Sequence, residues 1–110
     1  MRIVKHMMEL KSLLLMQAHM TEESKSGKGP SEATSVAKNA RARIRQEREE
    51  LLIEIMGFRG LGQAGDDFSE LELGTTRTFL ANKAMTIYSG TTEVQNNIIA
   101  KRMLGLLDHQ

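Results

Sequence analysis

The sequence has no cysteine, no tryptophan and only one proline. Without cysteine the chain can form no disulfide framework, no thiolate metal site and no cysteine nucleophile. Aromatic residues make up 4% of the chain, so a hydrophobic core has to come from Leu, Ile, Met and Ala side chains. The eight methionines and the scarcity of proline favour helices.

Net charge and long apolar runs are lacking as well. The formal net charge of +1 gives no overall attraction to nucleic acid or to an acidic membrane. The longest apolar run is far too short to cross a bilayer, and residues 1–6 contain no apolar core of a signal peptide. A chain of 110 residues has the usual length of one domain. We therefore expect one cytoplasmic helical domain that binds neither nucleic acid nor a membrane.

Hydrophobic periodicity predicts an all-α fold, an up-and-down helical bundle that is incomplete as a four-helix bundle within one chain. The expected helices span about residues 2–24, 32–56, 75–86 and 92–106. The apolar stripe of the first helix is so wide that we expect it to be buried between the chains of a homo-oligomer, a dimer or a tetramer. The stripe of the first helix consists of Ile3, Met7, Leu10, Leu14 and Ala18, widened by Val4, Met8, Leu13 and Leu15. Residues expected to be buried or to face inward are Ala37, Ala40, Ile44, Leu51 and Ile55 in the second helix, Leu80 and Ala84 in the third, and Val94, Ile98, Ile99 and Met103 in the last.

The segments between these helices carry turn signals. Residues 24–32 are rich in Gly, Lys and Ser and predict a solvated turn, after which Ser31 is a candidate N-cap. Gly57 predicts a left-handed end to the second helix. Residues 57–65 hold four glycines, which allow a close approach to a ligand or another backbone, but they match neither a Walker A loop nor a Rossmann fingerprint. Residues 66–74 are expected to form an acidic connector.

Basic residues recur on one side of the second helix. We favour a solvated face for this stripe, although a face that binds phosphate is the alternative. Two ion pairs at i,i+4 spacing are expected beside it, Arg43–Glu47 and Arg45–Glu49. The stripe consists of Lys38, Arg41, Arg45 and Arg48.

The segment TIYSGTTEVQ, residues 86–95, precedes and begins the last helix. Thr91 or Thr92 can cap this helix, and Glu93 lies in its first turn, where a carboxylate is favoured by the helix dipole. Gly90 permits the tight turn that delivers the cap. A helix start preceded by glycine and hydroxyl residues also suits polar or anionic ligand atoms, so a purely structural role and a binding role both remain open.

The same residues resemble the signature near the C-terminus of the acyl-CoA dehydrogenase family, which reads roughly I-Y-x-G-T-x-E-[IV]-Q-x-N-I-I-A-x-R-x-L-G-L. Residues 51–61, LLIEIMGFRGL, resemble more loosely the family's helix end Q-x-x-G-G-x-G. In all, the resemblance covers about residues 10–106. The matching positions of the signature are Ile87, Tyr88, Gly90, Thr91, Glu93, Val94, Gln95, Asn97, Ile98, Ile99, Ala100, Arg102, Leu104, Gly105 and Leu106.

This resemblance implies a flavoenzyme fold and activity. Family members use FAD to remove two hydrogens from the α and β carbons of an acyl-CoA thioester, and an electron-transfer flavoprotein reoxidises the flavin. Their C-terminal helical bundle forms the oligomer interface and holds part of the FAD, often the FAD bound mainly by a neighbouring subunit. By position, Gly90 would then lie against the acyl-CoA substrate. The residues expected to contact FAD are Thr91, Thr92 and Glu93, with Glu54 and Gly57 near its ADP end.

The departures from the family pattern bear on activity. Ser89 occupies the position of the glutamate base of many members, so no catalytic residue is assigned in this chain. Glu54 replaces the usual Gln, Phe58 replaces the second Gly of the loop, and the flavin-holding β-domain has no counterpart in the sequence. We therefore expect the chain by itself to be inactive.

Two function classes follow. The first is the C-terminal domain or a fragment of an acyl-CoA dehydrogenase, or a subunit that completes one. The second is a non-enzymatic helical association module or accessory subunit that has lost the catalytic base. A metal centre is not expected, because a di-iron bundle needs Glu-x-x-His motifs from two helices. The histidines and carboxylates that raise the question all lie on the first helix: His6, Glu9, His19 and Glu22.

Overall fold

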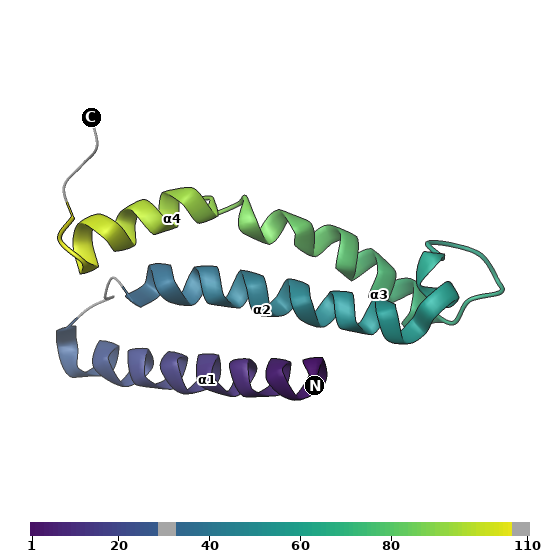
Figure 1. Ribbon diagram of the computed structural model, residues 1–110, viewed down its shortest axis with the longest axis horizontal. Helices are drawn as coiled ribbons and strands as arrows, with labels where there is room; N and C mark the ends of the chain where they lie inside the picture. Colours follow the sequence, from purple (N-terminus) through teal and green to yellow (C-terminus); the bar gives the residue numbers. More distant parts are fainter. Residues whose placement is uncertain (29–32, 107–110) are drawn as a thin grey trace.

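The computed structural model describes residues 1–28 and 33–106, and it confirms an all-α chain. Its four α-helices are α1 (Arg2–Glu23), α2 (Ala33–Met56), α3 (Glu70–Ala81) and α4 (Thr92–Ile98) (Figure 1). Short helical turns follow each of them, at Ser24–Lys28, Gly57–Leu61, Asn82–Thr86 and Ile99–Met103. These two stretches contain no strand and no helix long and apolar enough to cross a membrane.

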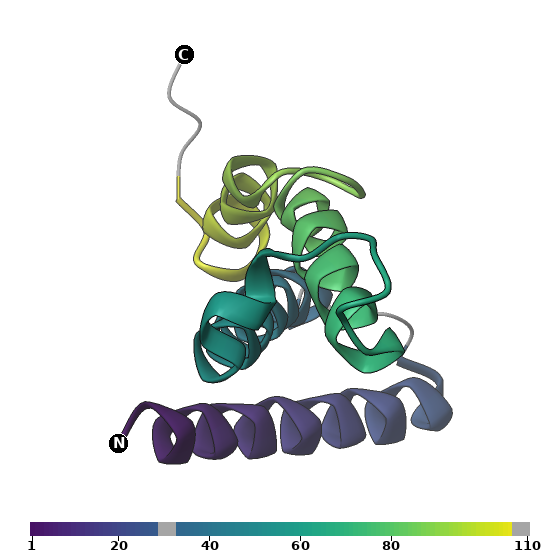
Figure 2. The same cartoon turned by 90° about the vertical axis from the view of Figure 1, so that its right-hand side faces the viewer.

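Helix α2 is the centre of the arrangement. It packs against α1 on one side and against both α3 and α4 on the other. Helices α3 and α4 follow one another along α2, joined by a short bent connection (Figure 1). Helix α1 crosses α2 obliquely below it, with its N-terminal end reaching past the other helices (Figure 2). The oblique crossing leaves much of α1 without a neighbour in this chain.

The core is correspondingly thin. No large side chain is completely buried within the described residues, because each outer helix is covered mainly by α2. The buried apolar side chains are Leu13, Ala37, Ala42, Ile44, Leu73 and Met85.

Most of the apolar stripe predicted for α1 is exposed within this chain. Leu13 and His6 are the buried residues of this helix, and Leu10 is half-buried. A single obliquely packed partner covers only this narrow face, so the rest of the stripe is open to solvent in the chain by itself. The exposed members of the stripe are Ile3, Met7, Leu14 and Ala18, and their burial between chains stays a prediction.

Helix α2 follows its predicted stripe more closely near its middle than near its end. Ala37 and Ile44 are buried, whereas Ala40 and Leu51 are half-buried. Ile55 is 68% exposed, so the predicted stripe does not continue as a buried face to the end of α2. The predicted end is confirmed: α2 stops at Met56, and Gly57 takes a left-handed φ of 58°. The predicted start of α2 and the proposed Ser31 cap lie outside the described residues.

The third helix begins five residues earlier than predicted. Its α-helical part ends at Ala81, and a tighter helical turn continues to the predicted end at Thr86. The expected acidic connector is helical from Glu70 onwards, because Ser69 and Glu72 form a capping box. The Ser69 hydroxyl accepts from the Glu72 N–H at 3.2 Å, and the Glu72 carboxylate accepts from the Ser69 N–H at 3.0 Å. These reciprocal bonds satisfy two amides that would otherwise lack partners.

The changed span of α3 also changes its buried face. Leu73 and Thr76 are buried in α3, and Met85 is buried in the tighter helical turn that follows. Leu80 and Ala84, which were predicted to face inward, are exposed. The helix tightens at Asn82, so Ala84 no longer follows the register of α3, whereas Leu80 lies within α3 and is 46% exposed there.

The last helix is shorter than predicted. Regular α4 ends at Ile98, a wider turn continues to Met103, and residues 104–106 are not helical. Ile98 and Ile99 are partly covered, as expected for inward residues. Val94 and Met103 are more exposed, at 49% and 47%. Only α2 lies beneath α4 and its final turn, so one side of this segment has no cover.

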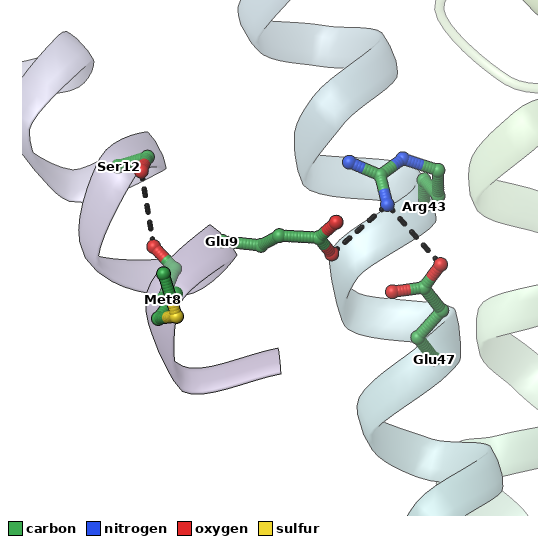
Figure 3. A network of polar contacts seen from close by, with 5 residues as sticks. All are labelled: Met8, Glu9, Ser12, Arg43 and Glu47. Atoms are coloured by element: carbon green, nitrogen blue, oxygen red, sulfur yellow. Dashed lines mark hydrogen bonds and ion pairs between the residues drawn. The ribbon is translucent and has the colours of Figure 1, made fainter. Parts of the chain in front are cut away.

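An ion-pair cluster joins α1 to α2. The Arg43 guanidinium donates to Glu9 of α1 at 3.0 Å and to Glu47 of α2 at 3.1 Å (Figure 3). The predicted Arg43–Glu47 pair is thus confirmed and has an interhelix member in addition. The predicted Arg45–Glu49 pair is wrong: the buried Glu49 carboxylate accepts from its neighbour Arg48 at 2.9 Å instead.

Candidate functional site

A sharp corner joins the turn Asn82–Thr86 to the start of α4. Ser89 and Gly90 adopt consecutive left-handed conformations, with φ of 56° and 93°. An added Cβ at Gly90 would lie 2.7 Å from Nε2 of Gln95, so the end of that flexible side chain would have to move. Position 90 therefore favours glycine mainly for its backbone angle, and a larger residue would also displace the Gln95 amide from the corner.

The first turn of α4 settles which threonine is the cap. Thr91 is the N-cap residue, and its Oγ1 accepts from the Val94 N–H at 3.2 Å. Thr92 is the first helical residue and is half-buried, while Glu93 is exposed in the first turn. The hydroxyl of Thr92 and the carboxylate of Glu93 are consequently not used by the cap.

Side chains from two helices hold the carbonyl groups of the corner. The Lys38 ammonium, on α2, donates to the Gly90 carbonyl oxygen at 2.6 Å. The Gln95 amide, on α4, donates to the Ser89 carbonyl oxygen at 2.9 Å. Together the two side chains hold the carbonyl groups of both left-handed residues, one from α2 and the other from α4.

Lys38 is the residue of this site that the sequence interpretation missed. It was taken as the first member of a solvated basic stripe, whereas it is half-buried against the corner. Its acceptor is a backbone carbonyl 52 positions away, and no spacing rule along α2 can reveal such a partner. Arg41, Arg45 and Arg48 are exposed, as expected for a solvated face.

A groove runs between α2 and α4 beside the corner. It encloses about 550 Å³, within the range of small-molecule sites, and opens to solvent. Val36 and Ala40 provide apolar walls from α2, Ile99 does so from the turn after α4, and Thr92 lines the groove from α4. Asn39 of α2 donates across to the Asn96 side chain at 2.9 Å, which ties the two helices together at this place.

The remaining predicted cofactor residues lie elsewhere. Glu54 and Gly57 are at the C-terminal end of α2, about 24 Å and about 28 Å along the helix axis from Lys38 at the usual rise per residue. Glu54 forms an ion pair with Arg2 of α1, and both side chains are more than half exposed. The structure thus brings together Gly90, Thr91, Thr92 and Glu93, but it does not bring Glu54 or Gly57 to them within one chain.

The histidines and carboxylates of α1 are not gathered into one group within the described residues. No cluster of three His, Asp or Glu side chains with suitable geometry occurs within residues 1–28 and 33–106. His19 pairs with Glu23 at 3.3 Å, and the buried His6 has no hydrogen-bond partner on either ring nitrogen. His19 belongs to the exposed surface of α1, whereas His6 belongs to the contact between α1 and α2.

The comparisons with known proteins agree with this corner and this fold. Residues 1–104 match the family description "Acyl-CoA dehydrogenase, C-terminal domain". The chain belongs to that family.

Two curated relatives are both named acyl-CoA dehydrogenase IpdE1. The protein of Mycolicibacterium smegmatis is 38% identical over 72 residues, which is 66% of this chain and 17% of that protein. The protein of Mycobacterium tuberculosis is 40% identical over 57 residues, 52% of this chain and 14% of that protein. The matched part is thus less than a fifth of either relative. No solved structure matches this chain.

Proposed function

We propose that this chain supplies the C-terminal helical part of an FAD-dependent acyl-CoA dehydrogenase, including an edge of the FAD and acyl-CoA site. The observation that carries the proposal is the corner at Ser89 and Gly90, whose two left-handed residues are held by Lys38 and Gln95. A helix start that needed only a cap would be served by Thr91 alone. The two additional hydrogen bonds from Lys38 and Gln95 to the backbone, here called the clamp, are typical of a surface that has to keep its shape for a ligand.

The polar groups of this corner fit an edge of FAD. The Thr92 hydroxyl can donate and accept hydrogen bonds, and the Glu93 carboxylate can accept them. Both suit the hydroxyl groups of a ribityl or ribose unit. Thr91 accepts one bond with its oxygen and keeps its own hydroxyl proton to donate. FAD bound beside them would supply the acceptor for the hydride that leaves the β carbon of the acyl-CoA. The four residues would bind and orient, with Gly90 leaving room for the acyl chain.

Glu54 and Gly57 are too distant to reach the same end of a cofactor as Thr91 in the same chain. We infer that they approach the ADP end of an FAD whose other contacts come from a second chain. This arrangement makes oligomerisation part of the site. The residues at the C-terminal end of α2 and those at the start of α4 then serve different FAD molecules.

Ser89 has no role as a base in this proposal. Its side chain is exposed, and its carbonyl is the acceptor for Gln95. A serine hydroxyl does not remove an α-proton at neutral pH without an adjacent base. The carboxylate that removes the proton is accordingly supplied from outside this chain.

The surface of the chain supports an oligomer. A compact protein of 12.3 kDa exposes about 6,100 Å², whereas this chain exposes 8028 Å². The excess is larger than the roughly 800 Å² that each partner buries in a standard protein–protein interface. Much of the apolar part lies on α1, where Val4, Met8 and Leu15 are all more than half exposed.

The test is recovery of the tagged chain from its own cells under conditions that preserve complexes. We expect a flavin-containing assembly that reduces an artificial electron acceptor when acyl-CoA is added, with an electron-transfer flavoprotein as its physiological oxidant. The chain purified alone should be colourless. In the assembly, Thr91→Ala should weaken flavin retention, whereas Ser89→Ala should cost little activity, compared with the roughly 10²–10⁴-fold loss when a general base is removed.

The alternative is an association module without enzymatic function. It is favoured by Ser89 in the position of the base and by the exposed apolar surface of α1. The same recovery experiment separates the two. An assembly that contains neither flavin nor acyl-CoA-dependent activity would support the association module and contradict the dehydrogenase.

A further inference from the structure

The contacts of Lys38 and Gln95 suggest a role that the family signature does not describe. Lys38 is the one member of the basic stripe that is half-buried, and its bond to the Gly90 carbonyl is short for N–H···O geometry, at 2.6 Å. Charge-assisted hydrogen bonds of this kind are about twice as strong as neutral ones. The bond links the middle helix of the chain directly to the turn before α4.

The turn needs such support. Ser89 carries a side chain at a φ of 56°, a region that L-residues other than Asn, Asp and His seldom adopt. A residue in this region costs free energy and persists only where its surroundings hold it. The Ser89 carbonyl is fixed by Gln95 at 2.9 Å, and the following carbonyl is fixed by Lys38.

We propose that Lys38 and Gln95 are positioning residues that together hold the Ser89–Gly90 corner in its left-handed conformation. Gln95 belongs to the helix that the corner begins, so by itself it can only fasten the turn to α4. Lys38 belongs to α2 and fixes the turn relative to the rest of the fold. The bond to the Gly90 carbonyl uses one of the three donors of the Lys38 ammonium.

The clamp also positions the surface at Gly90 on which acyl-CoA would rest, and this second role rests on the proposed function. If Gly90 lies against the substrate, a shift of its carbonyl moves the surface on which the acyl chain rests. Lys38 contacts neither FAD nor substrate in this proposal and acts through Gly90. Its loss should therefore affect substrate binding more than the chemical step.

The first experiment measures amide hydrogen exchange on the full chain without flavin or substrate. Val94 and Gln95 report on the corner, because their N–H groups donate to the Thr91 side chain at 3.2 Å and to the Thr91 carbonyl at 2.9 Å. In Lys38→Met we expect both amides to exchange about tenfold faster or more, the factor that loss of a charge-assisted hydrogen bond produces. The Leu73 amide, bonded to the Ser69 carbonyl at the far cap of α3, should be unchanged and shows that the variant is folded.

Three further variants make the result specific. Lys38→Arg keeps a charged donor and should restore most of the protection. Arg45→Met removes an exposed cation from the same helix and should leave Val94 and Gln95 as in the wild type. Gln95→Leu should speed exchange at Val94 by a smaller factor than Lys38→Met. Unchanged exchange at Val94 and Gln95 in Lys38→Met, with Leu73 protected, would overturn the clamp.

The second experiment addresses the substrate edge in the flavin-containing assembly. Lys38→Met should raise KM for acyl-CoA about tenfold while kcat changes less than threefold, and Lys38→Arg should recover most of the KM. Faster exchange with an unchanged KM would leave the clamp intact and overturn its role in placing substrate. A wild-type assembly without acyl-CoA activity would instead contradict the proposed function, and the exchange result would still decide the clamp.

Discussion

At the scale of single residues, the corner before α4 shows how backbone chemistry selects amino acids. Gly90 is favoured because its φ of 93° strains any other residue, and a Cβ there would also displace the Gln95 amide. Thr91 suits its position because its hydroxyl oxygen accepts from the Val94 N–H, as an N-cap side chain does. Ser89 is the exception, since its left-handed conformation comes from the contacts of its carbonyl and not from its side chain.

The first prediction concerns Gly90. Gly90→Val should destabilise the chain by about 1–3 kcal/mol, because a branched side chain has to adopt a left-handed φ and displace Gln95. Gly74→Ala is the matched control: its Cβ would meet nothing within 4 Å in the interior of α3, so alanine should add about 0.5–1 kcal/mol of stability. Urea unfolding followed by circular dichroism measures both. Equal effects of the two variants would contradict the strain assigned to Gly90.

At the scale of helices, the ends are decided by caps and the faces by neighbours. Helix α3 begins where Ser69 and Glu72 exchange hydrogen bonds, not where the apolar pattern begins. Helix α1 presents its wide apolar stripe largely to solvent, because α2 covers only the face that contains Leu13. Arg43 adds a polar connection between the same two helices (Figure 3).

The second prediction tests the cap of α3. Ser69→Ala should lower the free energy of unfolding by about 1 kcal/mol, because the Glu72 amide loses its acceptor. Thr75→Ala serves as the comparison, since the Thr75 hydroxyl donates only to the Leu71 carbonyl of its own helix. That substitution should change stability by a few tenths of a kcal/mol. Urea denaturation of the three proteins under one set of conditions provides the measurement.

The third prediction concerns acid stability. Hydrogen bonding from Arg43 holds the pKa of the Glu9 carboxyl below its usual range. A depressed carboxyl pKa stabilises the fold at neutral pH, and this contribution is lost as the pH falls below about 4.3, the usual value for glutamate, through the lower folded value. Glu9→Gln should therefore flatten the fall of stability between about pH 5 and pH 3.

Thermal unfolding of the wild type and Glu9→Gln across this pH range measures the difference in slope. Glu22→Gln is the control, because Glu22 lies on α1 but pairs only with Lys25 on the same helical surface. Parallel pH profiles for the wild type and Glu9→Gln would show that the interhelix pair does not contribute to acid sensitivity.

At the scale of the whole molecule, the chain is extended for its length. Its radius of gyration is 17.5 Å, whereas a compact domain of this size has about 13 Å. The obliquely crossing α1 is the main departure from a closed bundle (Figure 2). An open arrangement with exposed Met8 and Leu15 predicts that stable folding involves contacts between chains.

The fourth prediction is self-association through α1. Light scattering at micromolar concentration should report a dimer or a tetramer for the wild type. A double substitution, Met8→Lys with Leu15→Lys, should shift it to a smaller species, because these side chains are 67% and 60% exposed on one side of α1. Leu71→Lys changes a residue that is 80% exposed on α3 and should leave the assembly unchanged. A compact monomeric wild type would contradict this prediction.

The sequence by itself determined the helical class, the end of α2 at Gly57 and the turn at Gly90. These features follow from local rules: apolar periodicity, and glycine at backbone angles that other residues avoid. It also carried the family signature over residues 87–106, because that signature consists of neighbours along the chain.

Only the tertiary structure decided which faces are buried and what holds the corner. Burial on α1 depends on the angle at which α2 crosses it, and the register of the segment after α3 changes where the helix tightens at Asn82. The bond from Lys38 to Gly90 joins positions 52 residues apart. Such a contact exists only after α2 and α4 have packed together, so no pattern along the chain specifies it.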